Sequence, residues 1–164
     1  GMQRNYYEYK KDEMGIHIGK MPVWFTEKSV EGDAKQGAIE FHSNNEYDEV
    51  WGPNAKFRIE WEAKDRSEFY HAREVQESID MYNAINVVVT NKEQIWMRSH
   101  EFTYWFGKRT KMIRKRYYPE QIIHGVFYCE IKNRQYNVNA RVIKRHYEAF
   151  KPYILEAFKS IICH

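Results

Sequence analysis

The sequence lacks any long hydrophobic run. None of its apolar stretches approaches the ~20 residues that a membrane-spanning helix needs, so we expect a soluble protein with no membrane span. A basic segment followed by an apolar one, as in a secretory signal, is also missing after Met2. Gly1 matches the residue that tag removal leaves before a native start. These features favour a cytoplasmic location.

The common catalytic signatures are missing as well. We find no G-x-S-x-G, no phosphate-binding loop, no H-E-x-x-H and no dinucleotide fingerprint. The sequence therefore favours a non-enzymatic accessory or binding protein without a cofactor, whose partner is a protein of unknown identity. An enzyme stays open, because catalytic triads assemble from residues that are distant in sequence.

No linker rich in Gly, Ser or Pro divides the 164 residues, so we expect a single domain over residues 1–164. Hydrophobic residues make up 43% of the chain and charged residues 30%, with 13 Tyr, 9 Phe and 5 Trp, which is typical of a folded globular protein. A net charge of +3 does not by itself indicate a polyanionic partner. The excess of Glu over Asp, with frequent Lys, Arg, Tyr and Ile, leans toward a thermophilic source, such as an archaeon.

The hydrophobic pattern changes period along the chain. Alternation predicts strands over residues 5–9, 15–20, 37–42, 56–62, 86–90, 94–106, 121–131 and 135–143. We expect a turn at Asn91–Lys92 and a strand end at Gly107. Helical spacing predicts one helix that begins at Ser67 as N-cap and a second from His146 to the end, with Pro152 in its first turn or at a kink.

This order of elements, β-β-β-β-α-β-β-β-β-α, predicts the fold class. We expect an α+β fold with an antiparallel sheet of about six or seven strands flanked by helices, because each amphipathic helix needs a sheet face to cover.

The two cysteines, Cys129 and Cys163, are expected to lie close together. A hairpin that turns at Asn133–Arg134 places Cys129 opposite Val138, and the final helix doubles back over the same apolar face. One interpretation is a structural disulfide, although disulfides are rare in the cytosol; another is two reduced, buried cysteines. A metal site that adds His164 lacks a fourth ligand, and adjacent residues on a helix point apart, so we expect no metal.

A basic stretch offers a nucleic-acid alternative. It contains Lys108, Arg109, Lys111, Arg114, Lys115 and Arg116, within aromatic residues at 104–106 and 117–118. Cations that contact phosphates and rings that stack on bases are typical of single-strand binding. A β-hairpin with a solvated basic tip explains the same residues.

The predicted strand over residues 94–106 offers a third alternative. Alternation places Trp96, His100 and Phe102 on one face, where an aromatic surface with a histidine suits a small-molecule site or a hydrolase. Core packing, with His100 as a hydrogen-bonded structural histidine, explains the same pattern.

Three short motifs resemble those of one known fold family. They are the run Tyr147-x-x-Phe150-Lys151-Pro152-Tyr153 with Phe158-Lys159-Ser160-Ile161, the triplet Ser99-His100-Glu101, and Met21-Pro22-x-Trp24. In this order they are similar to the closing helix, the G-H-x-A strand and the early Y-P-x-W segment of the PsbP-like and DcrB-like α/β sandwich superfamily. The resemblance implies an antiparallel sheet between helices and an accessory or binding role without a known reaction. It transfers no site residue, because function inferred from fold is analogy.

Overall fold

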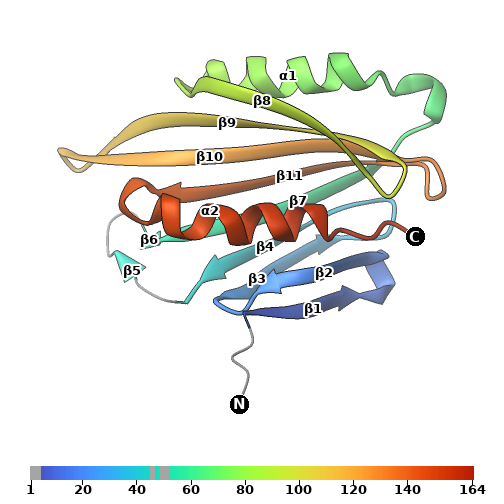
Figure 1. Cartoon of the computed structure of the whole chain (residues 1–164), viewed down its shortest axis with the longest axis horizontal. Helices are drawn as coiled ribbons and strands as arrows, with labels where there is room; N and C mark the ends of the chain where they lie inside the picture. Colours follow the sequence, from blue (N-terminus) through green and yellow to red (C-terminus); the bar gives the residue numbers. More distant parts are fainter. Residues whose placement is uncertain (1–4, 45–46, 49–51) are drawn as a thin grey trace.

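A seven-stranded antiparallel sheet forms the centre of the molecule (Figure 1). This computed structural model describes residues 5–44, 47–48 and 52–164, so the expected native start at Met2 lies outside the described residues. The strand order is β3-β4-β7-β11-β10-β9-β8. The strands are β3 (Phe25–Gly32), β4 (Gln36–Ser43), β7 (Ala55–Ala63), β8 (Val88–Met97), β9 (His100–Ile113), β10 (Arg116–Cys129) and β11 (Arg134–Ile143).

The remaining elements cover or extend this sheet. A separate hairpin consists of β1 (Tyr6–Lys11) and β2 (Ile16–Pro22), and two short strands, β5 (Tyr47–Asp48) and β6 (Gly52–Pro53), pair with each other. The helices are α1 (His71–Asn83) and α2 (Lys144–Lys159). The α+β class, the antiparallel sheet and the order of strands and helices are confirmed. Neither α1 nor α2 is long and apolar enough to cross a membrane.

The two helices lie on opposite faces of the sheet. Successive residues of a strand point to opposite faces, so alternate residues of one strand pack beneath different helices. Along β10, Ile122, Val126 and Tyr128 pack in the cluster beneath α1, together with Trp105 of β9. The alternate residues Ile123, Phe127 and Cys129 belong to the larger core beneath α2 and the β1–β2 hairpin. Each face of the central strands is therefore buried.

The predicted strand over residues 94–106 is divided by a turn. Arg98 and Ser99 take positive φ angles of 49° and 73°, and Met97 pairs with His100 across this two-residue hairpin loop. The prediction missed the turn because neither position holds the Gly or Asn that usually marks it. The turn expected at Asn91–Lys92 is wrong, since β8 runs through both residues with only a bulge between Val89 and Asn91.

Gly107 does not end a strand, because β9 continues to Ile113. A Cβ at this position would lie 2.6 Å from Cγ1 of Val87, so close packing against the preceding segment explains the glycine. Helix α1 begins at His71, and the Ser67 hydroxyl donates to Asp65 and not to the helix. The sequence prediction also missed β3.

The hairpin of β10 and β11 turns earlier than expected. Cys129 pairs with Arg134, and Val138 pairs with Gly125, so the predicted partner of Cys129 is wrong by four residues. Because four is an even number, the slip leaves every side chain on its predicted face. Ile131 is the exception, since it lies in the turn and is exposed.

Helix α2 begins before His146 and ends before the last residues. Pro152 lies inside it, and Ser160 follows the final turn. Residues 160–164 then run beside β2: Gly19 N–H donates to the carbonyl of Ser160 (3.0 Å), and Ile162 N–H donates to that of His17 (2.9 Å). Cys163 and His164 therefore do not belong to a helix.

Candidate functional site

Four side chains with metal-ligating atoms converge at one end of the central sheet. They are His100, Cys129, Cys163 and His164, and their nitrogen and sulfur atoms all lie within 4.8 Å of one another. The Nε2 atom of His100 is 3.1 Å from the sulfur of Cys163 and 3.3 Å from Nε2 of His164. The first three side chains are buried and His164 is exposed. We call these four residues the Cys/His cluster.

Three chain segments bring the Cys/His cluster together. His100 opens β9 directly after the Arg98–Ser99 turn, and Cys129 ends the neighbouring strand β10. Phe102 pairs with Phe127 two residues further in, so His100 and Cys129 share a face at adjoining strand ends. Cys163 and His164 arrive on the segment that β2 holds in place.

Cys129 and Cys163 form the predicted close pair. Their Cα atoms are 6.4 Å apart, which is within the range that a disulfide requires. The disulfide itself stays a prediction.

An open hollow of about 1000 Å³ adjoins the Cys/His cluster. We call it the aromatic hollow. Its lining residues are Arg66, Ser67, Phe69, Tyr70, His71, Ala72, Trp96, Ser99, His100, Glu101, Tyr128 and Glu130. Two large aromatic side chains stand exposed there, Trp96 at 72% and Tyr70 at 58%. The hollow thus combines an aromatic surface with a few polar groups, as binding sites do.

The structure separates the three residues that the sequence placed on one face. Trp96 pairs with Glu101 on the side of the hollow, whereas Phe102 is fully buried in the core. His100 lines the hollow, yet its ring is 4% exposed and belongs to the Cys/His cluster. The turn at Arg98–Ser99 causes the separation, because it ends the alternation that the prediction carried through from Trp96 to Phe102.

The second histidine at the hollow, His71, was not predicted. Its Nε2 lies 2.7 Å from the hydroxyl of Thr103 and 3.9 Å from Oε1 of Glu101. Burial lowers the pKa of His71 below its usual value, and Glu101 acts in the opposite direction. A neutral His71 is therefore expected at neutral pH.

The basic stretch forms the hairpin of β9 and β10, whose tip projects from the body of the molecule (Figure 1). Lys108, Arg114, Lys115 and Arg116 are exposed there. Arg109 instead lies against the buried carboxylate of Glu120, with Nε 2.5 Å from Oε1. Lys111 is half-buried, and burial lowers its pKa. Most of the flanking rings are buried, and Tyr117 is the exposed one, so the tip offers charge with one stacking surface.

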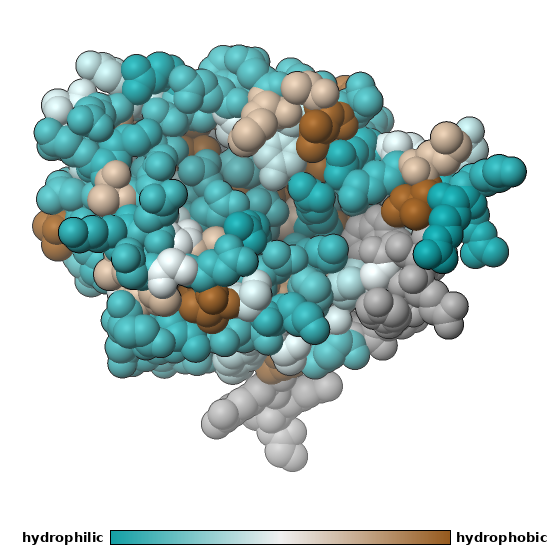
Figure 2. Space-filling view, turned by 180° about the vertical axis from the view of Figure 1, so that it is seen from behind, coloured by the Kyte–Doolittle hydropathy of each residue, from teal (hydrophilic) through white to brown (hydrophobic). Residues whose placement is uncertain are grey.

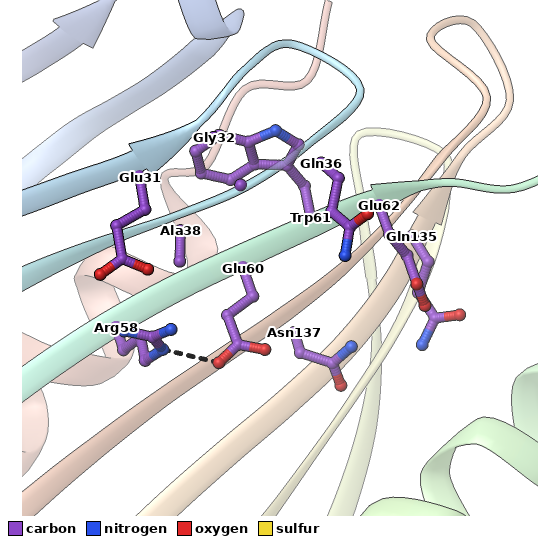
Figure 3. A pocket seen from close by; sticks show the side chains of 11 residues that line it. Glu31, Gly32, Gln36, Ala38, Arg58, Glu60, Trp61, Glu62, Gln135 and Asn137 are labelled. Carbon is purple, nitrogen blue, oxygen red and sulfur yellow. Dashed lines mark hydrogen bonds and ion pairs between the residues drawn. The ribbon is translucent and has the colours of Figure 1, made fainter.

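A second, polar hollow of about 430 Å³ lies over β4, β7 and β11 (Figure 3). Arg58 crosses its edge, donating from Nε to Glu60 (2.6 Å) and from Nη1 to Glu40 (3.3 Å). The view from behind shows a mainly hydrophilic face with scattered apolar side chains (Figure 2). Its lining carries the carboxylates of Glu31, Glu60 and Glu62 against the one guanidinium of Arg58, and its aromatic residue, Trp61, is buried, so the aromatic hollow is the stronger candidate for a partner that binds through exposed rings.

The architecture defines a class: the chain has the PsbP-like α+β fold. No protein-family model matches the sequence, and a comparison with curated proteins found no significant match. The solution structure of cyanobacterial PsbP (CyanoP) from Synechocystis sp. PCC 6803 matches with a TM-score of 0.65 at 11% identity, covering 99% of this chain and 95% of that chain.

Two further solved structures share the fold. The Ran-binding protein Mog1p of Saccharomyces cerevisiae matches with a TM-score of 0.64 at 7% identity, over 98% of this chain and 96% of that chain. PA94 of Pseudomonas aeruginosa, described as a protein of unknown function and putative regulator, matches with a TM-score of 0.53 at 10% identity, over 96% of each. At these identities the likeness concerns the fold alone.

Sequence reasoning missed the fourth member of the Cys/His cluster. It considered Cys129, Cys163 and His164 together but assigned His100 to a different site. No local sequence pattern links His100 to the cysteines. His100 reaches Cys129 only because β9 pairs with β10.

Proposed function

We propose that this chain is a non-enzymatic accessory protein of the cytoplasm that binds a protein partner through the aromatic hollow. The observation that carries the proposal is the exposure of Trp96 and Tyr70 on the lining of one hollow. Scattered exposed apolar residues are normal, whereas exposed aromatic residues that line one hollow are typical of interaction sites, and the residues that carry most of the binding energy of protein interfaces are enriched in Trp and Tyr.

The charge around Trp96 specifies the chemistry of the partner. Glu101 pairs directly across the strands with Trp96, and its side chain is 38% exposed. The carboxylate of Glu130, 54% exposed, lies on the same lining. Arg73 already lies over the ring of Tyr70, and Arg66 over that of Tyr128. An arginine or lysine of the partner would therefore use the ring of Trp96 beside the carboxylate of Glu101, which favours a basic segment with an apolar neighbour.

The fold offers a precedent for such a role. Mog1p is a Ran-binding protein, so a chain of this architecture is able to serve as a protein-binding module. This support is analogy, and it does not identify the partner or the surface that binds it.

Site-directed photo-cross-linking tests the proposal. A benzophenone amino acid replaces Ala72, which lines the hollow, and the matched control replaces Met81, which is exposed on the same helix. In cells that express the chain, we expect one defined protein adduct at position 72 and not at position 81. Trp96→Ala and Glu101→Lys should each abolish the adduct while leaving the thermal midpoint of unfolding nearly unchanged, because both side chains lie at the surface.

Two outcomes would contradict the proposal. One is the same adduct pattern at both positions, and the other is an adduct at position 72 that survives both substitutions.

The size of the hollow favours a small-molecule ligand as the second candidate, since ligand sites span roughly 300–1000 Å³. A hydrolase at His100 has weaker support, because this ring is buried and the nearby Ser67 donates to Asp65. Saturable quenching of Trp96 fluorescence by a small metabolite, lost in Trp96→Phe, would favour the ligand over the protein partner.

A further inference from the structure

One nitrogen of the Cys/His cluster lies within hydrogen-bond distance of two groups. Nε2 of His100 faces both the sulfur of Cys163 and Nε2 of His164. A neutral imidazole nitrogen carries either one proton or one lone pair, so it serves one of these contacts well. A metal ion in the middle would accept lone pairs from all four residues.

We propose that His100, Cys129, Cys163 and His164 form a Cys₂His₂ zinc site in the reduced protein. Two thiolates and two imidazoles are the ligand set of structural zinc, which binds them at about 2.3 Å (sulfur) and about 2.0–2.1 Å (nitrogen) in a tetrahedron. In that geometry the two nitrogens are about 3.3 Å apart, and the two Nε2 atoms of the cluster are separated by 3.3 Å. The sulfurs of Cys129 and Cys163 lie within disulfide-bonding distance of each other, so they would have to separate on reduction before both bind the ion. Soft sulfur with imidazole selects zinc over magnesium or calcium.

The surroundings place a carboxylate behind one ligand and anchor the segment that carries two others. Oε2 of Glu130 lies 3.4 Å from Nδ1 of His100, and this nitrogen has no hydrogen-bond partner among the described residues. A carboxylate behind a ligating histidine fixes which nitrogen points at the metal. On the opposite side, Ile161 bridges to Ile18 of β2, which anchors the segment that carries Cys163 and His164.

The same two cysteines serve the predicted disulfide, so the site has two exclusive states. A dithiol reductant transfers two electrons and two protons to the Cys129–Cys163 disulfide, giving two thiols, and is itself oxidised to a disulfide. Zinc then binds both sulfurs as thiolates and releases two protons. A reducing cytosol favours the zinc state, and an oxidising compartment favours the disulfide.

Cobalt(II) titration of the purified, reduced, metal-free chain tests the site. We expect one cobalt per chain, with the visible and thiolate charge-transfer absorption of a tetrahedral S₂N₂ centre, and displacement by one equivalent of zinc. The oxidised protein should give no such spectrum. Glu130→Gln should weaken affinity by about 10–100-fold, and His164→Gln by more, whereas His42→Gln, which removes an imidazole paired with Glu40 elsewhere, should bind like the parent.

His164 is the decisive ligand, because it is exposed and its replacement leaves the core intact. Loss of the tetrahedral spectrum in a folded His164→Gln chain supports the site. An intact reduced chain that gives no tetrahedral spectrum, or a His164→Gln chain that binds like the parent, overturns it. No partner takes part in this titration, so its result is independent of the cross-linking experiment.

Discussion

Replacement of Arg109 by alanine should strongly destabilise the fold, because this residue neutralises a buried charge. The side chain of Glu120 is fully buried and that of Arg109 is 10% exposed. One carboxylate oxygen of Glu120, Oε2, has no hydrogen-bond partner among the described residues, so Arg109 is its main compensation. Removing one partner of a buried ion pair costs about 3–5 kcal/mol, since the other charge stays buried and unpaired.

A loss of stability of this size is measurable by thermal and by urea unfolding. In a chain of this length that unfolds in one step, 1 kcal/mol shifts the thermal midpoint by about 2–4 °C, so Arg109→Ala should lower it by roughly 6–20 °C. Urea unfolding monitored by tryptophan fluorescence gives the free energy directly. The double variant Arg109→Met with Glu120→Leu should recover most of the loss, because an apolar pair of similar volume replaces a buried ion pair at little cost.

The matched control is Lys108→Ala, the exposed neighbour on the same strand, which should change stability by less than about 0.5 kcal/mol. A loss below about 1 kcal/mol in Arg109→Ala, or a double variant no more stable than the single one, would refute this reasoning. In that case Arg109 would again be a candidate residue for nucleic-acid binding, together with the other basic residues of the hairpin.

Three further predictions concern other parts of the chain. Burial lowers the pKa of His124 to about 4, from an ordinary value of 6.5. Between these two pH values the unfolded chain binds a proton that the folded chain does not, so the free energy of unfolding falls as the pH falls. Urea unfolding near pH 7 and about pH 4.5 should show a loss that is about 2–3 kcal/mol smaller in His124→Gln; equal losses would contradict the assignment. Arg134 donates to the carbonyls of Met14, Gly15 and Ala34, so Arg134→Lys, which lacks the planar fork, should cost about 2 kcal/mol or more in the same assay. If the basic hairpin binds single-stranded DNA, the affinity should fall steeply with salt, and Arg114→Ala with Lys115→Ala should reduce that dependence; no retention at low salt excludes the nucleic-acid alternative.

The elements with a clear hydrophobic period were predictable. Phe57, Ile59 and Trp61 alternate along β7, and Tyr147, Phe150 and Ile154 mark the buried stripe of α2, because burial on one face dictates both patterns. The turn at Arg98–Ser99 was not predictable, since its positive φ angles are imposed by the pairing of Met97 with His100 and not by a glycine or asparagine.

The close approach of Cys129 and Cys163 was predicted through a register that proved wrong by four residues. It survived because an even slip keeps the same face, and face decides which side chains meet α2. One premise of the argument against a metal was wrong, since it placed Cys163 and His164 on a helix, whereas they lie beyond the end of α2. The expectation of no metal itself stays a prediction, which the cobalt titration tests.

The sequence by itself determined the fold class, the order of the elements and the apolar faces, because these depend on local periodicity. Tertiary structure alone decided which residues share a site. His100 lies 29 positions before Cys129 and 63 before Cys163, so only strand pairing and the anchoring of residues 160–164 on β2 unite them. The same pairing directs Trp96 outward and Phe102 inward, and so separates an exposed binding surface from the core.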